Sequence, residues 1–227
     1  MLATAFQGKK TEKDTVIIAA GVSNSQEVKQ QEFLREECLL LDILKKYNNK
    51  TIIYFSTCSV YQIESSPYIK HKLKMENLIQ SLASSFYIFR LPQVVGLTTN
   101  TTIVSYFVQC LLQKKSLIIQ QKASRSLIDV SDVVRIALLV IENGALENSL
   151  IDVTNTRSIF VPELLNKISR ITGISPIIEL VDGGYTYKIP VDKIKLILPE
   201  NDFIFSDQYY DLILESYVPK IIHSMKK

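Results

Sequence analysis

The amino-acid sequence predicts an α/β fold in which a mostly parallel sheet is flanked by helices. Short apolar runs alternate with longer segments of helical period, which is typical of β-α-β units. The composition agrees, because 47% apolar residues, 22% charged residues and a mean hydropathy of +0.13 are typical of a globular chain and exclude disorder as the main state. The 227 residues suffice for one large domain, or a domain with a small appendage, since single domains run to roughly 100–200 residues.

Charge and cysteine content exclude several classes of function. Lys and Arg number 26 against 23 Asp and Glu, a net charge of +3, so neither a strongly basic surface nor a nucleic-acid partner is expected. Cys38, Cys58 and Cys110 form no C-x-x-C pair and accompany only two histidines, so we expect reduced cysteines, no metal site and no disulfide framework. The apolar runs are far shorter than the roughly 18 residues of a membrane helix, and no signal-peptide pattern is present. We therefore expect a cytoplasmic protein without a membrane partner.

The first elements follow from local signals. The apolar run at 15–20, TVIIAA, predicts a buried strand. A helix over 26–47 is predicted from apolar side chains at helical spacing, and Asn48-Asn49 ends it. These side chains are Phe33, Leu40, Leu41 and Leu44. The run TIIYF at 51–55 predicts the next strand.

Ser66 and Pro67 predict the start of a helix over 68–82, since Ser is a favoured N-cap and Pro is favoured at the first helical position. The run FYIF at 86–89 predicts a strand. The same alternation continues to residue 142, and after Asn143-Gly144 the pattern changes to that of a smaller C-terminal part. The further predicted elements are a helix over 101–113, a strand at 117–119, a helix over 132–142, a strand at 150–153, a helix over 162–172 and a strand at 176–181.

Tyr68 and Lys72 are four residues apart on a predicted helix, so their side chains share one face. An ammonium beside a phenol favours the phenolate, which lowers the tyrosine pKa from about 10 and makes the side chain a general acid or base. The spacing alone carries no signal, because a chain with 11 tyrosines contains about one Y-x-x-x-K by chance. The alternative interpretation is that Tyr68 and Lys72 lie on a solvated helix face. The upstream block S-T-C-S-V-Y at 56–61 raises the significance of the Tyr68 and Lys72 pair, because this block places hydroxyls at the carboxyl end of a strand, where open α/β sheets bind ligands.

Two further blocks follow, R-L-P-Q-V-V-G at 90–96 and R-S-L-I-D-V-S-D at 125–132. In this order the blocks resemble the extended short-chain dehydrogenase/reductase family, the NAD-dependent epimerase/dehydratases of nucleotide-sugar metabolism. Residues 15–21 are similar to the family's strand and cofactor-side loop, and Tyr68 with Lys72 matches its catalytic Y-x-x-x-K. The tail from Leu150 is similar to its substrate-binding region.

The resemblance implies a Rossmann-like domain over 1–149 and a smaller C-terminal substrate-binding region over 150–227 that does not fold independently. It implies NAD or NADP as cofactor and a nucleotide sugar as substrate. The catalytic residues it implies are Thr57, Tyr68 and Lys72; the cofactor-binding residues are Ala19, Ala20, Gly21, Lys72 and Pro92; the substrate-binding residues are Ser59 and Arg125. The alternative, purely structural roles are that Thr57 ends a strand and that Arg125 forms a surface ion pair.

The sequence also departs from the family. Its glycine-rich turn, which lets backbone amides approach a pyrophosphate, is absent. Residues 1–6 read like the helix that follows such a turn, and residues 7–14 leave no room for the usual second strand, so we expect a fold truncated at its N-terminus. Cys58 and Ser59 replace the Asp-Glu pair of the family's sugar dehydratases, which argues against 4,6-dehydratase chemistry.

Two functions remain open. The first is an NAD(P)-dependent reductase or epimerase acting on a nucleotide-activated sugar in surface polysaccharide synthesis. The second is a Rossmann-like protein that has lost cofactor binding and serves as a non-catalytic binding or scaffolding subunit. A homodimer through the helix that carries Tyr68 and Lys72 is compatible with either function. This helix offers Leu73, Ile79 and Leu82 for the contact, and core packing explains these three residues equally well. His71 is assigned no role.

Overall fold

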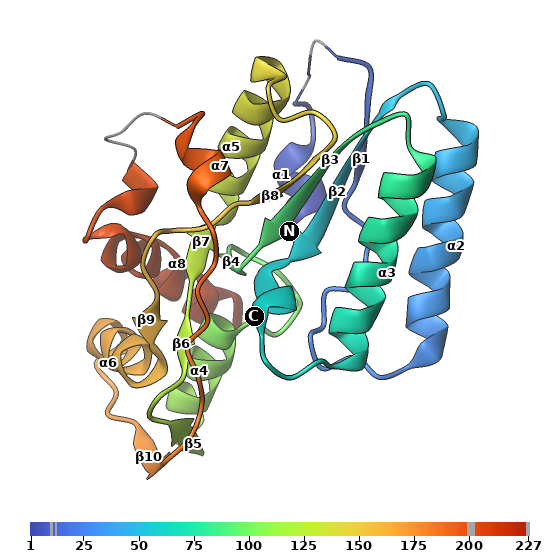
Figure 1. Cartoon of the computed structure of the whole chain (residues 1–227). Helices are drawn as coiled ribbons and strands as arrows, with labels where there is room; N and C mark the ends of the chain where they lie inside the picture. The colour runs from blue at the N-terminus through green and yellow to red at the C-terminus, as the bar shows by residue number, and fades with distance from the viewer. Residues whose placement is uncertain (10, 12, 199–202, 226–227) are drawn as a thin grey trace.

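The structure is a computed structural model that describes residues 1–9, 11, 13–198 and 203–225. Its centre is a four-stranded parallel sheet with strand order β1-β2-β3-β8 (Figure 1). The strands are β1 (Thr15–Ile18), β2 (Thr51–Thr57), β3 (Ser85–Leu91) and β8 (Ser149–Asp152). Every residue of β2 is buried, as expected of a parallel strand that is covered on both faces.

Helices α2 (Gln30–Lys46) and α3 (Pro67–Leu82) cover one face of the sheet (Figure 1). Their apolar side chains pack on alternate residues of β2 and β3, because successive side chains of a strand point to opposite faces. The α3 helix begins where its capping signal predicts: Ser66 Oγ accepts a hydrogen bond from the N–H of Ile69 (3.2 Å), and Pro67 is the first helical residue.

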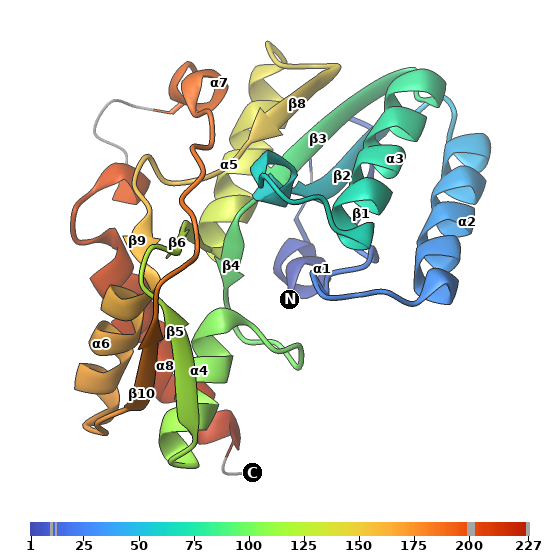
Figure 2. The ribbon, with the colours of Figure 1, turned by 60° about the horizontal axis from the view of Figure 1, so that its bottom comes forward.

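The opposite face is covered by α1 (Leu2–Phe6) and α5 (Val130–Asn143) (Figure 2). The α5 helix has Asp129 as its N-cap and ends at Gly144, which adopts the left-handed conformation. The short helix predicted for residues 1–6 is thus confirmed, and it packs on α5.

A second group of elements lies beside the sheet (Figure 2). Its helices are α4 (Ile103–Leu112), α6 (Val161–Thr172), α7 (Asp192–Lys195) and α8 (Tyr209–Met225), with the 3-10 turn η2 (Phe203–Phe205). Its strands are β5 (Ser116–Gln120), which pairs in parallel with β10 (Ile177–Val181), and β6 (Ser124–Arg125), which pairs antiparallel with β9 (Ile159–Phe160). Strands β4 (Gln93–Val95) and β7 (Leu127–Asp129) form a third, parallel pair.

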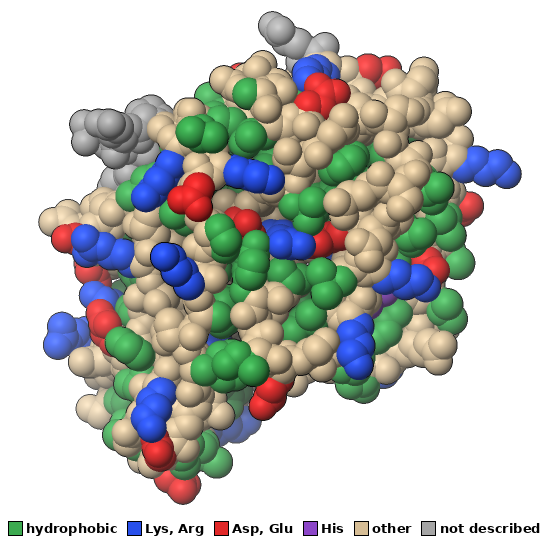
Figure 3. Space-filling model, in the orientation of Figure 1, with side chains coloured by type: hydrophobic (Ala, Val, Ile, Leu, Met, Phe, Trp, Pro, Cys, Tyr) green, Lys and Arg blue, Asp and Glu red, His purple; other side chains and the backbone are tan. Residues whose placement is uncertain are grey.

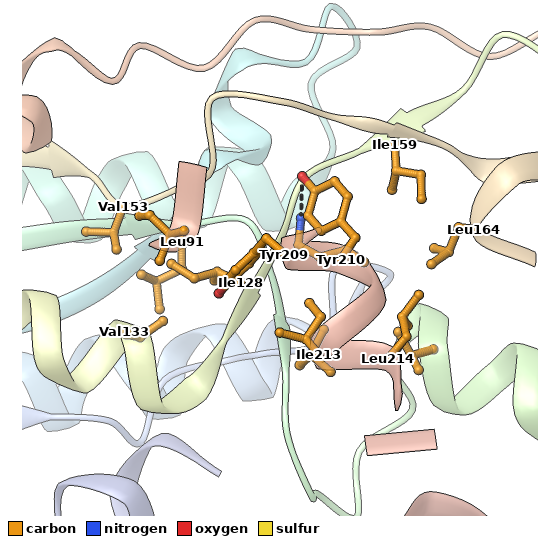
Figure 4. Close-up of a cluster of buried hydrophobic side chains, with 14 of the residues drawn as sticks. Leu91, Ile128, Val133, Val153, Ile159, Leu164, Tyr209, Tyr210, Ile213 and Leu214 are labelled. Carbon is orange, nitrogen blue, oxygen red and sulfur yellow. Dashed lines mark hydrogen bonds between the residues drawn. The ribbon is translucent and has the colours of Figure 1, made fainter. Parts of the chain in front are cut away.

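The core of this second group continues the core of the sheet. Tyr209, Tyr210, Ile213 and Leu214 of α8 point into a cluster with side chains from β7, β9, α5 and α6 (Figure 4). The predicted α/β fold with a parallel sheet is confirmed, whereas helix α8 was not predicted. The expected division at residues 149 and 150 stays a prediction; β8 completes the central sheet, and β5, from before residue 150, pairs with β10, from after it. Within the described residues, no helix is both long and apolar enough to cross a membrane.

Candidate active site

The implied site residues other than Arg125 lie at or near the carboxyl ends of the central strands. Residues 19–22 follow β1, Thr57 ends β2, and Tyr68 lies in the first turn of α3. Because the strands are parallel, their carboxyl ends share one edge of the sheet. The 3-10 turn η1 (Cys58–Tyr61) follows β2 directly, and Thr57 Oγ1 caps it by accepting from the N–H of Ser59 (3.0 Å).

Tyr68 is a buried phenol beside the Thr57 hydroxyl. Its side chain packs with Val22 and Ile69, and the residue is 7% exposed. Burial raises the pKa of Tyr68 to about 12, and the hydrogen bond with Thr57 offsets only part of this effect. Tyr68 therefore holds its proton at neutral pH. The lowering of its pKa expected from Lys72 is not found in this structure, because the ammonium is directed elsewhere.

The Lys72 ammonium is paired with a carboxylate that the sequence did not indicate. Nζ donates to Glu36 Oε1 on α2 and to the hydroxyl of Tyr54 on β2, each at 2.9 Å. It lies 6.0 Å from the ring centre of Tyr68. Lys72 and Glu36 therefore form an ion pair with side chains that are 3% and 2% exposed.

Each oxygen of Glu36 accepts two hydrogen bonds. Oε1 accepts from Lys72 and from Tyr54 (2.6 Å), and Oε2 accepts from the N–H of Val22 (2.6 Å) and pairs with Nε2 of His71 (2.9 Å). Burial opposes ionisation, but the hydrogen bond with His71, the charge of Lys72 and the Tyr54 hydroxyl together lower the pKa of Glu36 to about 2. The carboxylate is ionised at neutral pH and all its acceptor positions are filled.

His71 belongs to this cluster, although no pattern in the sequence indicated a role for it. Its ring stacks on Phe33 of α2 with the ring centroids 4.7 Å apart. A His and a Glu separated by 35 residues share no local pattern, so no signal in the sequence pairs them.

Gly21 covers the ion pair. A Cβ atom built on Gly21 would lie 2.3 Å from Glu36 Oε1 and 2.8 Å from Lys72 Nζ. A side chain at this position would have to displace the buried ends of Glu36 and Lys72, so the glycine backbone leaves room for the pair.

Ala19 and Ala20 line an open hollow of about 500 Å³ beside β1. The other lining residues are Ala3, Thr4, Phe6, Gln7 and Ile17. Small side chains at the end of a parallel strand leave this hollow open at the edge of the sheet where open α/β folds bind their ligands. Pro92 lies between β3 and β4 and is half-buried.

A second ion pair, in which Glu76 is buried and Arg90 is partly buried, supports the same edge of the sheet. Arg90 of β3 donates from Nε and Nη2 to the two oxygens of Glu76 on α3 (2.9 and 2.6 Å), and Ser56 Oγ donates to Glu76 (2.6 Å). Arg90 Nη1 also donates to Tyr61 OH (3.0 Å), which in turn donates to Asp152 on β8 (2.9 Å). Arg90 is therefore a structural cation that joins α3, η1 and β8.

Ser59 and Arg125 lie on different parts of the structure. Ser59 is in η1, whereas Arg125 is on β6, where its Nη1 donates to the carbonyl of Ser124 (2.7 Å). Burial raises the pKa of Tyr187, and the positive charge of Arg125 opposes this effect. Tyr185 donates to Gln62 (3.3 Å), so the segment after β10 reaches the end of η1. The segment is tightly turned, since Gly184 has φ +83°.

Lys, Arg, Asp and Glu side chains are interspersed over the face seen in Figure 3. Among the described residues, no group of three or more His, Cys, Asp or Glu is placed to hold a metal ion. On α3, Ile79 is fully buried, whereas Leu73 and Leu82 are 36% and 53% exposed, so only the latter two could take part in the dimer contact, which stays a prediction.

Residues 4–152 match the NAD dependent epimerase/dehydratase family. The chain belongs to this family. No curated protein matches it.

Solved structures share the fold of this epimerase/dehydratase family member at low identity. UDP-glucuronic acid 4-epimerase from Bacillus cereus, solved with UDP-glucuronic acid and NAD, aligns at a TM-score of 0.78 and 18% identity over 98% of this chain and 78% of that one. The dTDP-glucose 4,6-dehydratase from Bacillus anthracis, solved with NAD, aligns at 0.74 and 17% over 94% and 74%. UDP-glucose 4-epimerase from Thermotoga maritima aligns at 0.72 and 20% over 94% and 78%.

Proposed function

We propose that this family member is an NAD(P)-dependent reductase or epimerase that acts on a nucleotide-activated sugar in the cytoplasm, in surface polysaccharide synthesis. One observation carries the proposal: Thr57 at the carboxyl end of β2 lies beside the Tyr68 phenol, with Lys72 one turn further along the same helix.

Tyr68 transfers the proton, and Thr57 holds the reacting oxygen of the sugar. Since burial raises the pKa of Tyr68 to about 12, the phenol begins the reaction protonated and acts as an acid toward a substrate oxygen. A protonated Tyr68 favours a reaction that begins with reduction of a carbonyl group of the sugar. Withdrawal of a proton from a sugar hydroxyl would first require that Tyr68 lose its own.

Ala19, Ala20, Gly21 and Pro92 would contact the cofactor, with Pro92 in the segment that the family places beside the nicotinamide. A bound nicotinamide supplies or accepts the hydride. The hollow beside Ala19 and Ala20 supports this placement, and the family membership supports the cofactor. Lys72 would contact the cofactor ribose.

The nucleotide sugar would bind between η1 and the second group of elements. Ser59 lies on the first side and Arg125 on the second. The planar guanidinium of Arg125 suits the diphosphate of a nucleotide sugar, because it donates to two oxygens at once.

The experiment that tests the function is a titration of the chain with NADH and with NADPH, followed by nicotinamide fluorescence. Saturable binding, then hydride transfer to or from a nucleotide sugar such as UDP-glucuronic acid that is lost in Tyr68→Phe, is expected. Tyr106→Phe, which alters an exposed tyrosine, is the matched control. Failure to bind either dinucleotide up to millimolar concentration would overturn the proposal.

The second candidate is a non-catalytic binding or scaffolding subunit. The pairing of Lys72 with Glu36 favours it, since this contact occupies the group that the family uses for the cofactor. The same titration separates the two candidates: nucleotide-sugar binding without dinucleotide binding would support the second.

A further inference from the structure

The Glu36 carboxylate sits where four elements meet. It extends from α2 and accepts from the loop after β1 (Val22 N–H), from β2 (Tyr54) and from α3 (Lys72), with His71 beside it. Converging N–H and O–H donors around one carboxylate form an anion cradle. The anion in this cradle belongs to the protein itself.

We propose that Glu36 is a positioning residue of the site: its carboxylate fills this cradle beneath Gly21 and holds the Lys72 ammonium there, so that a ligand engages Lys72 only when the contact opens. Engagement of Lys72 by a ligand rests on the proposed function, whereas the contacts of Glu36 in the cradle are independent of it.

The geometry of Lys72 supports the first step. An ammonium has three N–H donors, and two of them are taken by Glu36 and Tyr54. Gly21 approaches so closely that a Cβ atom there would lie 2.8 Å from Nζ. The ammonium is therefore covered by the backbone as well as paired.

The charge of Lys72 also depends on Glu36. Burial lowers the pKa of Lys72, and the charge and hydrogen bond of Glu36 act in the opposite direction. The negative charge of Glu36 in turn raises the pKa of Tyr68. Removing this carboxylate thus frees the amine and weakens the retention of the proton on Tyr68.

A neighbouring ion pair provides a matched control. Glu37 of α2 pairs with Lys74 of α3 at 2.6 Å, but the Lys74 side chain is 56% exposed. The two pairs join the same helices, and only one of them is enclosed.

The first test is amine labelling of the full chain with a lysine-reactive reagent, with modification at each lysine followed by mass spectrometry. In the unaltered protein we expect Lys72 to react at least about tenfold more slowly than Lys74, because labelling requires local opening. Glu36→Gln should increase the labelling rate of Lys72 by about tenfold, and Glu37→Gln should leave it unchanged. Equal rates at Lys72 and Lys74 in the unaltered protein, or unchanged protection in Glu36→Gln, would overturn the proposal.

The second test probes the cradle directly. Glu36→Ala leaves the donors in place and removes the anion, so added sodium formate should raise the melting temperature of this variant and protect its Lys72 from labelling. Sodium chloride at equal ionic strength is the salt control, and Glu36→Gln, which fills the space, should not respond to formate. A Glu36→Ala protein that folds but gains nothing from formate would contradict the cradle. If it does not fold, the Glu36→Gln labelling result decides.

The third measurement separates this proposal from the proposed function. If a dinucleotide engages Lys72, Glu36→Gln should bind NADH about five- to tenfold more tightly than the unaltered protein, since the competing contact is gone. Unchanged or weaker NADH binding in Glu36→Gln would show that the contact does not oppose the ligand. If neither protein binds NADH, the proposed function fails, while the labelling and formate results still decide the role of Glu36.

Discussion

Lys72 Nζ and Glu36 Oε1 are 2.9 Å apart in a pair that water hardly reaches, with side chains that are 3% and 2% exposed. Two residues further along α3, Lys74 pairs with Glu37 at a similar distance on the surface. Distance alone therefore does not distinguish the two pairs. Desolvation does, because the loss of one partner from an enclosed pair leaves an uncompensated buried charge.

We expect Glu36→Ala to lower the free energy of unfolding by about 3–5 kcal/mol, as is typical when one partner of a buried pair is removed. Glu37→Ala should lower it by only about 0–1 kcal/mol, the range of exposed pairs. Urea unfolding followed by circular dichroism measures both. Similar losses in the two variants would show that the Glu36 pair is no more important than the surface pair.

Glu36 should also make the stability depend on pH in the acid range. Its pKa is about 2 in the folded protein against 4.5 for an ordinary glutamate. Because the folded pKa is the lower one, the stabilisation is present above pH 4.5 and is lost as the pH falls toward 2. The difference corresponds to about 3 kcal/mol.

Urea unfolding between pH 2 and pH 7 tests this dependence. The Glu36→Gln variant should lose stability less steeply below pH 4.5 than the unaltered protein, since it has no carboxylate to protonate at this position. Parallel curves for the two proteins would contradict the expectation.

Tyr68→Phe removes the proposed proton donor without changing the shape of the site. We expect kcat to fall by about 10²–10⁴-fold, the usual contribution of a general acid. The affinity for NADH should change little, because the phenyl ring of the variant keeps the packing with Val22 and Ile69. Steady-state rates and nicotinamide fluorescence measure the two quantities, and an active Tyr68→Phe protein would exclude Tyr68 as the donor.

Gly184→Ala should destabilise the segment that follows β10. A Cβ atom at Gly184 would lie 2.6 Å from the backbone nitrogen of Ala123, and its φ of +83° is unfavourable for alanine. The clash and the strain together should cost about 2–4 kcal/mol. Gly173 has φ +69° with open space around it, so Gly173→Ala should cost only about 1 kcal/mol. Thermal unfolding of both variants checks the difference, which would be absent if only the backbone angle mattered.

Local signals predicted most of the elements. Ser66 and Pro67 fix the first turn of α3, because a cap and a preset φ act within a few residues. Helix α8 escaped prediction. It contains Pro219, which ordinarily reads as a helix breaker, and it is held by packing of Tyr209, Ile213 and Leu214 in the core.

The candidate site likewise contains features that local signals predict and features that they do not. That Tyr68 and Lys72 share a helix face follows from the helical repeat, and that Thr57 ends a strand follows from the apolar run before it. The partner of Lys72 is 36 residues away in the chain, and no periodicity connects the two. His71 likewise finds its partner only when α2 and α3 pack together.

The sequence by itself determined the order of strands and helices, the capping of α3 and the family to which the chain belongs, because periodicity, capping and short motifs act between near neighbours. The tertiary structure alone decided the state of the site. Packing α2 against α3 beneath Gly21 removed water from Lys72 and Glu36, and in that dry space their attraction directs the ammonium to Glu36 while Tyr68 keeps its proton.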